Sequence, residues 1–242
     1  MAGRPLVILK TGNSFPELVQ RAGDFEEWIA NGLATPPERV TVCDARRDEL
    51  PSPAGTAGVV ITGSPAMLTN DEPWMLAAEA WVRELAGASV PVLGICFGHQ
   101  LLARALGGRV DWSDDGREIG TTRVTLTPAG RHDPLLGGLG PSFVAQSSHA
   151  QRVTELPPRA EELARSERQP LAAFRLGTTW GVQFHPEFSA EIMRAYVDRH
   201  AEAMRAEGDD PGAVRRTVTD SPAGAILARF AEHALGADGP AR

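Results

Sequence analysis

The chain has 242 residues, of which 42% are hydrophobic and 23% charged, values that suit a globular protein with a sizeable core. Its formal net charge of −7 argues against binding of nucleic acid or of an anionic membrane surface, because both require clustered Lys and Arg. No apolar run approaches the roughly 18 residues that span a bilayer, and two cysteines cannot form a disulfide framework, so we expect a cytoplasmic protein.

The first half of the chain alternates between apolar strands and amphipathic helices. A continuous apolar run, typical of a strand buried on both faces of a parallel sheet, occupies 6–9, and further strands are indicated over 40–43, 58–61 and 90–95. Apolar residues at helical spacing extend through Phe25, Trp28 and Ile29, over 73–86 and over 97–106. This alternation predicts an α/β fold with a mostly parallel open sheet and helices on both of its faces.

The second half begins with shorter β-like segments and ends in helices. The clearest β-like segments are 121–127, 142–145 and 181–184. Ser189 has the character of an N-cap, and a helix follows it until a break at 208–211, after which a second helix covers 222–235. We therefore predict one domain over 1–188 and a helical extension over 189–242, packed on the same domain or, alternatively, on a partner.

Lys10 is the only lysine, which restricts the chemistry that the chain can perform. A phosphate-binding loop requires Gly immediately before its lysine and again five residues earlier. Leu9 and Arg4 occupy those two positions. The sequence therefore argues against nucleotide hydrolysis through such a loop.

Cys96 lies between a predicted strand and a predicted helix, with Gly94 and Gly98 two residues away on either side. A nucleophile at such a junction sits on a tight, strained turn that the two glycines keep free of side-chain collisions. The turn places the sulfur at the C-terminal edge of the sheet, and the adjacent helix N-terminus stabilises a thiolate. A buried structural cysteine is the alternative, but the strand–helix context favours a nucleophile.

His185 and Glu187 supply the partners that a thiol nucleophile needs. An imidazole takes the thiol proton and returns it to the leaving amine, and a carboxylate orients the imidazole. In an extended segment the side chains alternate, so residues 185 and 187 are expected on the same side. Taken alone, this pair could equally be a surface histidine beside an acidic residue. The catalytic interpretation gains support only because Cys96 is also present.

Two motifs, G-I-C-F-G-H-Q at 94–100 and Q-F-H-P-E at 183–187, resemble those of the class I (triad) glutamine amidotransferases, in the same order and about ninety positions apart. The closest likeness, over 6–187, is to the glutaminase domain of GMP synthase and its free-standing relatives. The resemblance implies that 1–188 form a flavodoxin-like amidotransferase domain with a catalytic triad of Cys96, His185 and Glu187. It also implies an oxyanion hole made by the backbone N–H groups of Ser64 and Phe97.

The same resemblance implies a set of residues around the substrate. They are Gly63, Gln100, Ser148 and His149. Ser64 stands where the family has the second glycine of its Gly-Gly-Pro loop, and Ala150-Gln151 stand where the family often has Gly-Asp. This second difference leaves the identity of the substrate open. Gln100 fits an ordinary polar helix residue equally well.

The remaining polar residues have less specific signals. The segment 111–120, which contains Arg117 and Glu118, borders either the pocket or a partner surface. We expect packing or surface positions for the other histidines and for the second cysteine, namely His99, His132, His200, His233 and Cys43.

Together these features predict hydrolysis of the side-chain amide of glutamine through a γ-glutamyl thioester at Cys96, with release of ammonia and without a metal or an organic cofactor. The ammonia acceptor would be a separate synthase, because this chain has no ATP-binding loop. One alternative is a hydrolase of γ-glutamyl peptides or amines with the same triad. Another is a regulatory relative without catalysis, although a full Cys, His and Glu set argues against it. An α/β-hydrolase with a cysteine nucleophile is a further alternative. That fold has its acidic residue between the nucleophile and the histidine in the sequence, whereas Glu187 follows His185.

Overall fold

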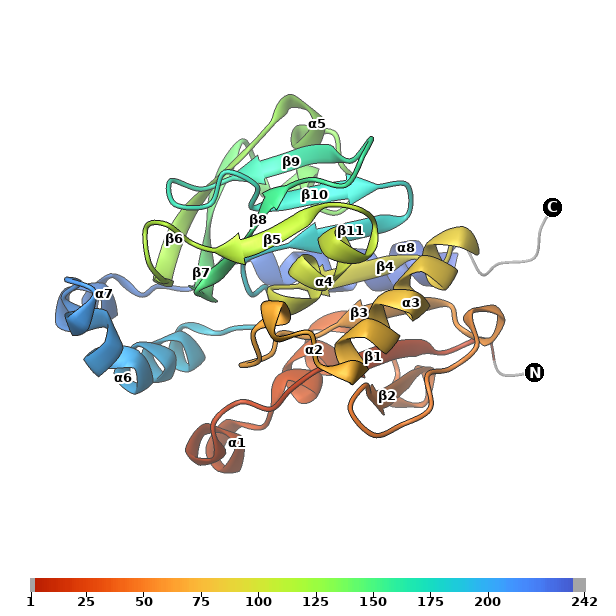
Figure 1. Cartoon of the computed structure of the whole chain (residues 1–242), viewed down its shortest axis with the longest axis horizontal. Helices are drawn as coiled ribbons and strands as arrows, with labels where there is room; N and C mark the ends of the chain where they lie inside the picture. The colour runs from red at the N-terminus through yellow and green to blue at the C-terminus, as the bar shows by residue number, and fades with distance from the viewer. Residues whose placement is uncertain (1–2, 237–242) are drawn as a thin grey trace.

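The computed structural model describes residues 3–236 and shows a layered α/β architecture (Figure 1). The strands are β1 (Leu6–Lys10), β2 (Val40–Asp44), β3 (Gly58–Ile61), β4 (Val92–Ile95), β5 (Arg109–Trp112), β6 (Glu118–Leu126), β7 (Ser142–His149), β8 (Gln151–Glu155), β9 (Glu161–Arg165), β10 (Ala173–Leu176) and β11 (Thr179–Val182). The α-helices are α1 (Pro16–Ala22), α2 (Phe25–Leu33), α3 (Pro73–Gly87), α4 (Phe97–Ala105), α5 (Pro128–Arg131), α6 (Ala190–Ala206), α7 (Pro211–Thr217) and α8 (Ala225–Gly236).

Within residues 3–236, nine strands form one mixed sheet in the order β2-β1-β3-β4-β11-β10-β9-β6-β7. Neighbouring strands are parallel from β2 to β11 and antiparallel from β11 to β7. A separate antiparallel pair consists of β5 and β8. The predicted flavodoxin-like α/β sheet with helices on both faces is confirmed. Its antiparallel half accounts for the shorter β-like segments in the second half of the sequence.

Strand β1 shows why a helical layer is needed on each face of the sheet. Leu6 and Ile8 pack in one apolar cluster with residues of α2 and α8. Val7 and Leu9 pack in a second cluster with residues of α3 and α4. Because successive side chains of a strand point to opposite faces, a fully apolar strand is stable only when both faces are covered.

The structure differs from the sequence-based expectation in several short elements. Helix α1 begins at Pro16, where the sequence suggested only a break, because proline is tolerated at the first position of a helix. Strands β5, β8, β9 and β10 and helix α7 were not predicted. Each is only four to seven residues long and most mix buried with exposed positions, so their local patterns are weak.

The C-terminal helices pack on the rest of the fold. The Ser189 hydroxyl accepts a hydrogen bond from the Ile192 amide at 3.2 Å, as predicted for an N-cap. Helix α6 shares an apolar cluster with α1 and α2, and α8 packs against β1 and β3. The predicted helical tail is therefore present. The division of the chain at 188 stays a prediction, and positions 237–242 of the extension lie outside the described residues.

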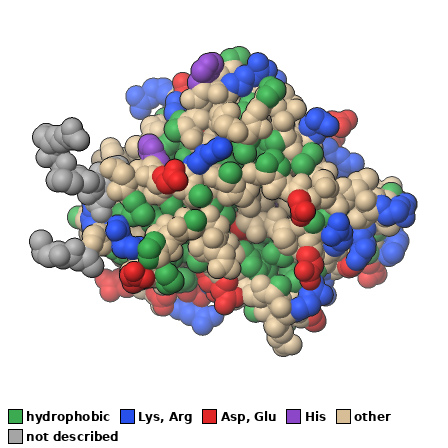
Figure 2. All heavy atoms as spheres, turned by 180° about the vertical axis from the view of Figure 1, so that it is seen from behind, with side chains coloured by type: hydrophobic (Ala, Val, Ile, Leu, Met, Phe, Trp, Pro, Cys, Tyr) green, Lys and Arg blue, Asp and Glu red, His purple; other side chains and the backbone are tan. Residues whose placement is uncertain are grey.

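Two features bear on the cellular location and on possible partners: the apolar character of the helices and the distribution of surface charge. None of the described helices is both long enough and apolar enough to cross a membrane. On the face that Figure 2 shows, basic and acidic side chains lie intermixed around the edge. A cytoplasmic location and the lack of a nucleic-acid partner stay predictions.

Candidate active site

Cys96 occupies a strained turn between β4 and α4. Its backbone has φ of 51° and ψ of −101°, which is unfavourable for a residue with a Cβ and costs about 1–3 kcal/mol at sites where it is retained. A Cβ at Gly94 would lie 2.4 Å from the Gly98 carbonyl oxygen, and a Cβ at Gly98 would lie 2.5 Å from the Ile61 carbonyl oxygen. The two glycines therefore let the turn close and let α4 approach β3, as the sequence pattern predicts.

The topology brings the segment around His185 to the same edge of the sheet. Strand β11 is the parallel neighbour of β4, with Val182 in register with Ile95. The chain therefore leaves both strands at one edge, with Cys96 after β4 and His185 shortly after β11. The His185 amide also donates a hydrogen bond to the Gln146 carbonyl at 2.7 Å, which ties this segment to β7.

His185 and Glu187 contact each other directly, although the backbone between them is not extended as predicted. The Phe188 amide donates to the His185 carbonyl at 3.4 Å, so 185–188 form a turn around Pro186. In this turn the His185 Nδ1 lies 2.7 Å from a Glu187 carboxylate oxygen, and both side chains are buried. The alternation argument was wrong for this segment, and the turn itself places the two side chains together.

The surroundings of His185 favour its protonated form. Burial lowers its pKa, but the negative charge of Glu187 and the interaction with the Cys96 sulfur outweigh burial and raise the pKa to about 10. Phe188 stacks on the imidazole with 4.0 Å between ring centroids, which fixes the ring plane. A Cβ at Gly63 would lie 2.9 Å from the His185 Cε1, so glycine is needed there for this ring position.

The backbone amides of Phe97 and Ser64 are the predicted oxyanion donors, and both residues line the same cavity as Cys96. Phe97 is the first residue of α4, and the first N–H groups of a helix have no partner within it. Ser64 follows β3, and its hydroxyl donates to the Thr11 carbonyl at 2.9 Å, which holds this side chain against the loop after β1. A Cβ at Gly12 would lie 2.5 Å from the Ser64 oxygen. Gly12 therefore provides the space that Ser64 takes up in place of the family's glycine.

Three of the four predicted substrate residues, Gln100, Ser148 and His149, line one cavity of about 390 Å³ together with Cys96, whereas Gly63 is not among the residues that line it. The Ser148 carbonyl lies 3.6 Å from the Cys96 sulfur. His149 also lines the cavity, and its Nε2 lies 3.0 Å from a Glu118 carboxylate oxygen. The Gln100 side chain donates to the Gln151 carbonyl at 2.8 Å, so much of its hydrogen-bonding capacity holds β8 in place.

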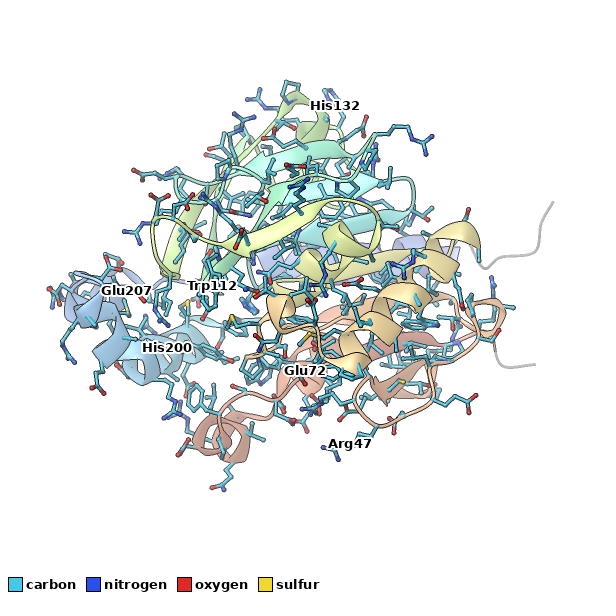
Figure 3. All side chains as sticks on the ribbon, viewed as in Figure 1. Arg47, Glu72, Trp112, His132, His200 and Glu207 are labelled. Carbon is cyan, nitrogen blue, oxygen red and sulfur yellow. The ribbon has the colours of Figure 1, made fainter. Side chains whose placement is uncertain are left out.

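The lining of the cavity also includes residues that were not predicted as site residues. Among them are Arg117, Tyr196, Arg199 and His200. Arg117 and Ile119 line the cavity, so part of the segment 111–120 borders the pocket, while a partner surface for the rest of this segment stays a prediction. His200 was expected on the surface or in packing; it is half-buried, and it also lines the cavity. It lies on α6, whose sequence pattern gives no sign that α6 reaches a site built around Cys96 (Figure 3).

His99, His233 and Cys43, which the sequence analysis also considered, pack against other side chains. Burial lowers the pKa of His99 to about 3, so this imidazole is neutral, and its ring centroid lies 5.2 Å from that of Phe174. His233 packs edge-on against Trp180, and Cys43 is buried beneath α3. Within residues 3–236, no cluster of three or more His, Cys, Asp or Glu side chains is arranged to hold a metal ion.

Comparison with known proteins connects this geometry to a family. The family model described as Glutamine amidotransferase class-I matches residues 19–200. A subunit of the glutamine-hydrolysing GMP synthase of Methanopyrus kandleri is 38% identical over 133 residues, which are 54% of this chain and 66% of that protein. The GMP synthase of Thermosipho melanesiensis is 31% identical over 205 residues, which are 82% of this chain and 36% of that protein.

A solved structure shows the same fold over nearly the whole chain. A glutamine amidotransferase of Thermotoga maritima superposes with a TM-score of 0.71 at 19% identity and covers 97% of this chain and 99% of its own. The matches to the two GMP synthases span two thirds or less of those proteins. The match over residues 19–200 establishes that the chain belongs to the class I glutamine amidotransferases, a family of enzymes.

Proposed function

We propose that the protein hydrolyses the side-chain amide of glutamine or of another γ-glutamyl compound, with Cys96 as nucleophile, His185 as acid and base, and Glu187 as the group that orients His185. The observation that carries this proposal is the convergence of these three side chains at one sheet edge. The imidazole lies against the carboxylate on one side, and interaction with the Cys96 sulfur raises its pKa. An imidazolium beside a sulfur at a helix N-terminus favours the reactive thiolate.

The proposed reaction proceeds in two steps. The thiolate of Cys96 attacks the amide carbonyl, and the N–H groups of Phe97 and Ser64 stabilise the charge on its oxygen. The C–N bond breaks as His185 gives its proton to the departing nitrogen, which leaves a γ-glutamyl thioester. A water molecule then loses a proton to His185 and attacks the thioester. Glutamate is released, and the thiolate–imidazolium pair is restored.

A test of this proposal follows the acyl group and the oxygen of water. We expect the protein to convert glutamine to glutamate and ammonia in equal amounts, with heavy oxygen from labelled water in the γ-carboxylate. An acid quench during turnover should trap a γ-glutamyl adduct on the peptide that contains Cys96, detected by mass spectrometry. Turnover with labelled product but with no trapped adduct under saturating substrate, or inactivity on every γ-glutamyl amide, would contradict the proposal.

The pH dependence of the proposed reaction follows from the pKa of His185. The protonated imidazole donates to the leaving nitrogen, and this form is present below its pKa and lost as pH rises through about 10. We therefore expect kcat/KM to hold through neutral and mildly alkaline pH and to fall near pH 10. A pH–rate profile with a neutral γ-glutamyl amide measures this limb, and a fall near the ordinary histidine value of 6.5 would contradict the assignment.

A second candidate is a glutaminase whose ammonia passes to a separate synthase. The observation that favours it is the similarity to a protein named as a subunit of GMP synthase. In that case the protein alone would turn over glutamine slowly, and addition of the synthase with its nucleotide substrates would raise the rate. Equal rates with and without that synthase would favour hydrolysis by the isolated chain.

A further inference from the structure

Lys10, the only lysine of the chain, is buried at the end of β1 and has no role in the proposed reaction. Its Nζ lies 3.0 Å from a carboxylate oxygen of Asp24, and the exposed fractions of the two side chains are only 11% and 4%. Glu26 is a second acidic partner of the same ammonium group. Because a buried ion pair adds little stability relative to well-packed apolar side chains, stability alone explains this pair poorly.

The Asp24 carboxylate divides its hydrogen bonds between its two oxygens. Oδ1 accepts from the backbone amides of Ser14 at 2.8 Å and of Phe25 at 2.9 Å. Oδ2 accepts from the Lys10 Nζ at 3.0 Å and from the Asn13 side chain at 2.7 Å. Asp24 is also the N-cap of α2, which packs against β1 (Figure 1), and capping needs only one side-chain oxygen. The bonds of Oδ2 therefore serve the end of β1 and the loop that follows it.

This arrangement favours the ionised form of Asp24. Burial raises the pKa of the carboxyl, but the two backbone hydrogen bonds and the bonds from Lys10 and Asn13 outweigh burial and hold the pKa below its ordinary value. A carboxylate has acceptor sites for all four donors, whereas an amide in its place would present N–H groups to two of them.

The segment 11–14 lies between Asp24 and the turn that carries the proposed oxyanion donor of Ser64. At one end of the segment, the Ser64 hydroxyl donates to the Thr11 carbonyl at 2.9 Å, and the Thr11 hydroxyl donates to the Gly63 carbonyl at 3.1 Å. At the other end, the bonds to Asp24 hold the last two residues of the segment, which line the cavity. A shift of this segment would therefore also move the oxyanion turn.

Phe25 connects Asp24 to the imidazole by a second route. The Phe25 ring stacks with the His185 ring at 6.3 Å between centroids and with the Phe188 ring at 6.2 Å. Phe25 also lines the cavity, and it is the first residue of α2, so its backbone is held directly by the Asp24 cap. The orientation of the imidazole thus depends in part on this cap.

We propose that Asp24 is a positioning residue for the hydrolysis, which acts through the segment 11–14 on the oxyanion turn and through Phe25 on His185, and that Lys10 holds its carboxylate in place. This inference rests on the proposed function and extends it beyond the triad. Asp24 does not itself line the cavity. The oxyanion turn and the imidazole stabilise charge that develops in the transition state, so this role predicts an effect on kcat rather than on KM.

The test separates this role from helix capping. Asp24→Asn keeps an oxygen for the two backbone amides and remains a good N-cap, but it turns an N–H group toward Lys10 and Asn13. Glu26 stays as a partner of Lys10, so the variant should fold. We expect kcat for glutamine hydrolysis to fall by about tenfold to hundredfold, less than the roughly 10²-fold to 10³-fold loss of a whole oxyanion donor, with KM within about threefold of wild type.

Asp24→Ser gives a second comparison if Asp24→Asn does not fold. Serine also caps a helix, and its single side-chain oxygen cannot serve Lys10 and Asn13 as well, so kcat should fall by a similar factor. Glu26→Gln is the matched control, because it removes the other acidic partner of Lys10 and Glu26 does not line the cavity. This control should keep the wild-type kcat. Circular dichroism checks that each variant is folded.

The outcomes distinguish the positioning role from the proposed function. A wild-type kcat in a folded Asp24 variant, or a loss that lies entirely in KM, would overturn the positioning role and leave the proposed hydrolysis intact. Equal losses of kcat in Asp24→Asn and Glu26→Gln would also overturn it, because the cause would then be the unbalanced charge of Lys10. A wild-type protein that cleaves no γ-glutamyl amide would instead overturn the proposed function, and the role of Asp24 with it.

Discussion

Replacement of Cys96 by alanine is expected to lower kcat for γ-glutamyl amide hydrolysis by roughly 10⁴-fold to 10⁶-fold, the loss that follows removal of the nucleophile in enzymes that form an acyl intermediate. The variant has no atom that can form the thioester, so the trapped adduct should also disappear. The residual rate would come from the oxyanion donors and from binding alone. Single-turnover release of glutamate, followed over hours, measures a rate this low.

The sequence contains a natural control for this experiment. Cys43 is the only other cysteine, is buried in the cluster beneath α3, and does not line the cavity. Cys43→Ala should therefore keep its activity, with at most a modest loss of stability from the small cavity created. Near-ultraviolet circular dichroism of both variants should match that of the wild type. Activity of Cys96→Ala within a hundredfold of wild type, in a folded sample, would rule out Cys96 as the nucleophile.

Replacement of Glu187 by glutamine should lower kcat by roughly 10²-fold to 10⁴-fold, because an amide can hold the imidazole in the wrong tautomer and cannot stabilise the imidazolium. It should also change the pH profile. Glu187 is the main positive contribution to the pKa of His185, so its neutralisation should bring that pKa down from about 10. The alkaline limb of kcat/KM should move to lower pH by the same amount.

This shift distinguishes an electrostatic role of Glu187 from a purely structural one. Wild type and Glu187→Gln are compared on the same substrate, so titration of the substrate cancels. Glu191→Gln is the control, since Glu191 lies in the first turn of α6 and its side chain is mostly exposed. A lower kcat in Glu187→Gln with an unmoved alkaline limb would show that the carboxylate does not set the pKa of the imidazole.

The turn at Cys96 is the part of the candidate site that could be predicted best from local sequence. Its conformation depends on residues within two positions, and an apolar strand before it and a helix after it complete the signal. The proximity of Cys96 to His185, which line the same cavity, has a different basis. It requires β4 and β11 to be neighbours although they lie far apart in the chain, and only the family resemblance pointed to this before the strand order was known.

Two local details of the candidate site depend on contacts between distant segments. Ser64 is accommodated because Gly12, from another loop, leaves room for its hydroxyl. The local pattern around Ser64 shows only a turn, so its effect on the oxyanion loop could not be predicted. The turn at 185–188 likewise depends on the hydrogen bond from His185 to Gln146 on β7, which a period-two pattern does not reveal.

The sequence by itself determined the class of fold, the order of its main strands and helices, and the residues that carry the proposed chemistry, because apolar periodicity and tight turns are encoded over a few neighbouring positions. Only the tertiary structure decided that α6 lines the cavity, through Tyr196, Arg199 and His200. The physical reason is that a charged residue on an amphipathic helix has the same local pattern whether it faces solvent or a site. Its surroundings are set by the packing of α6 against α1 and α2.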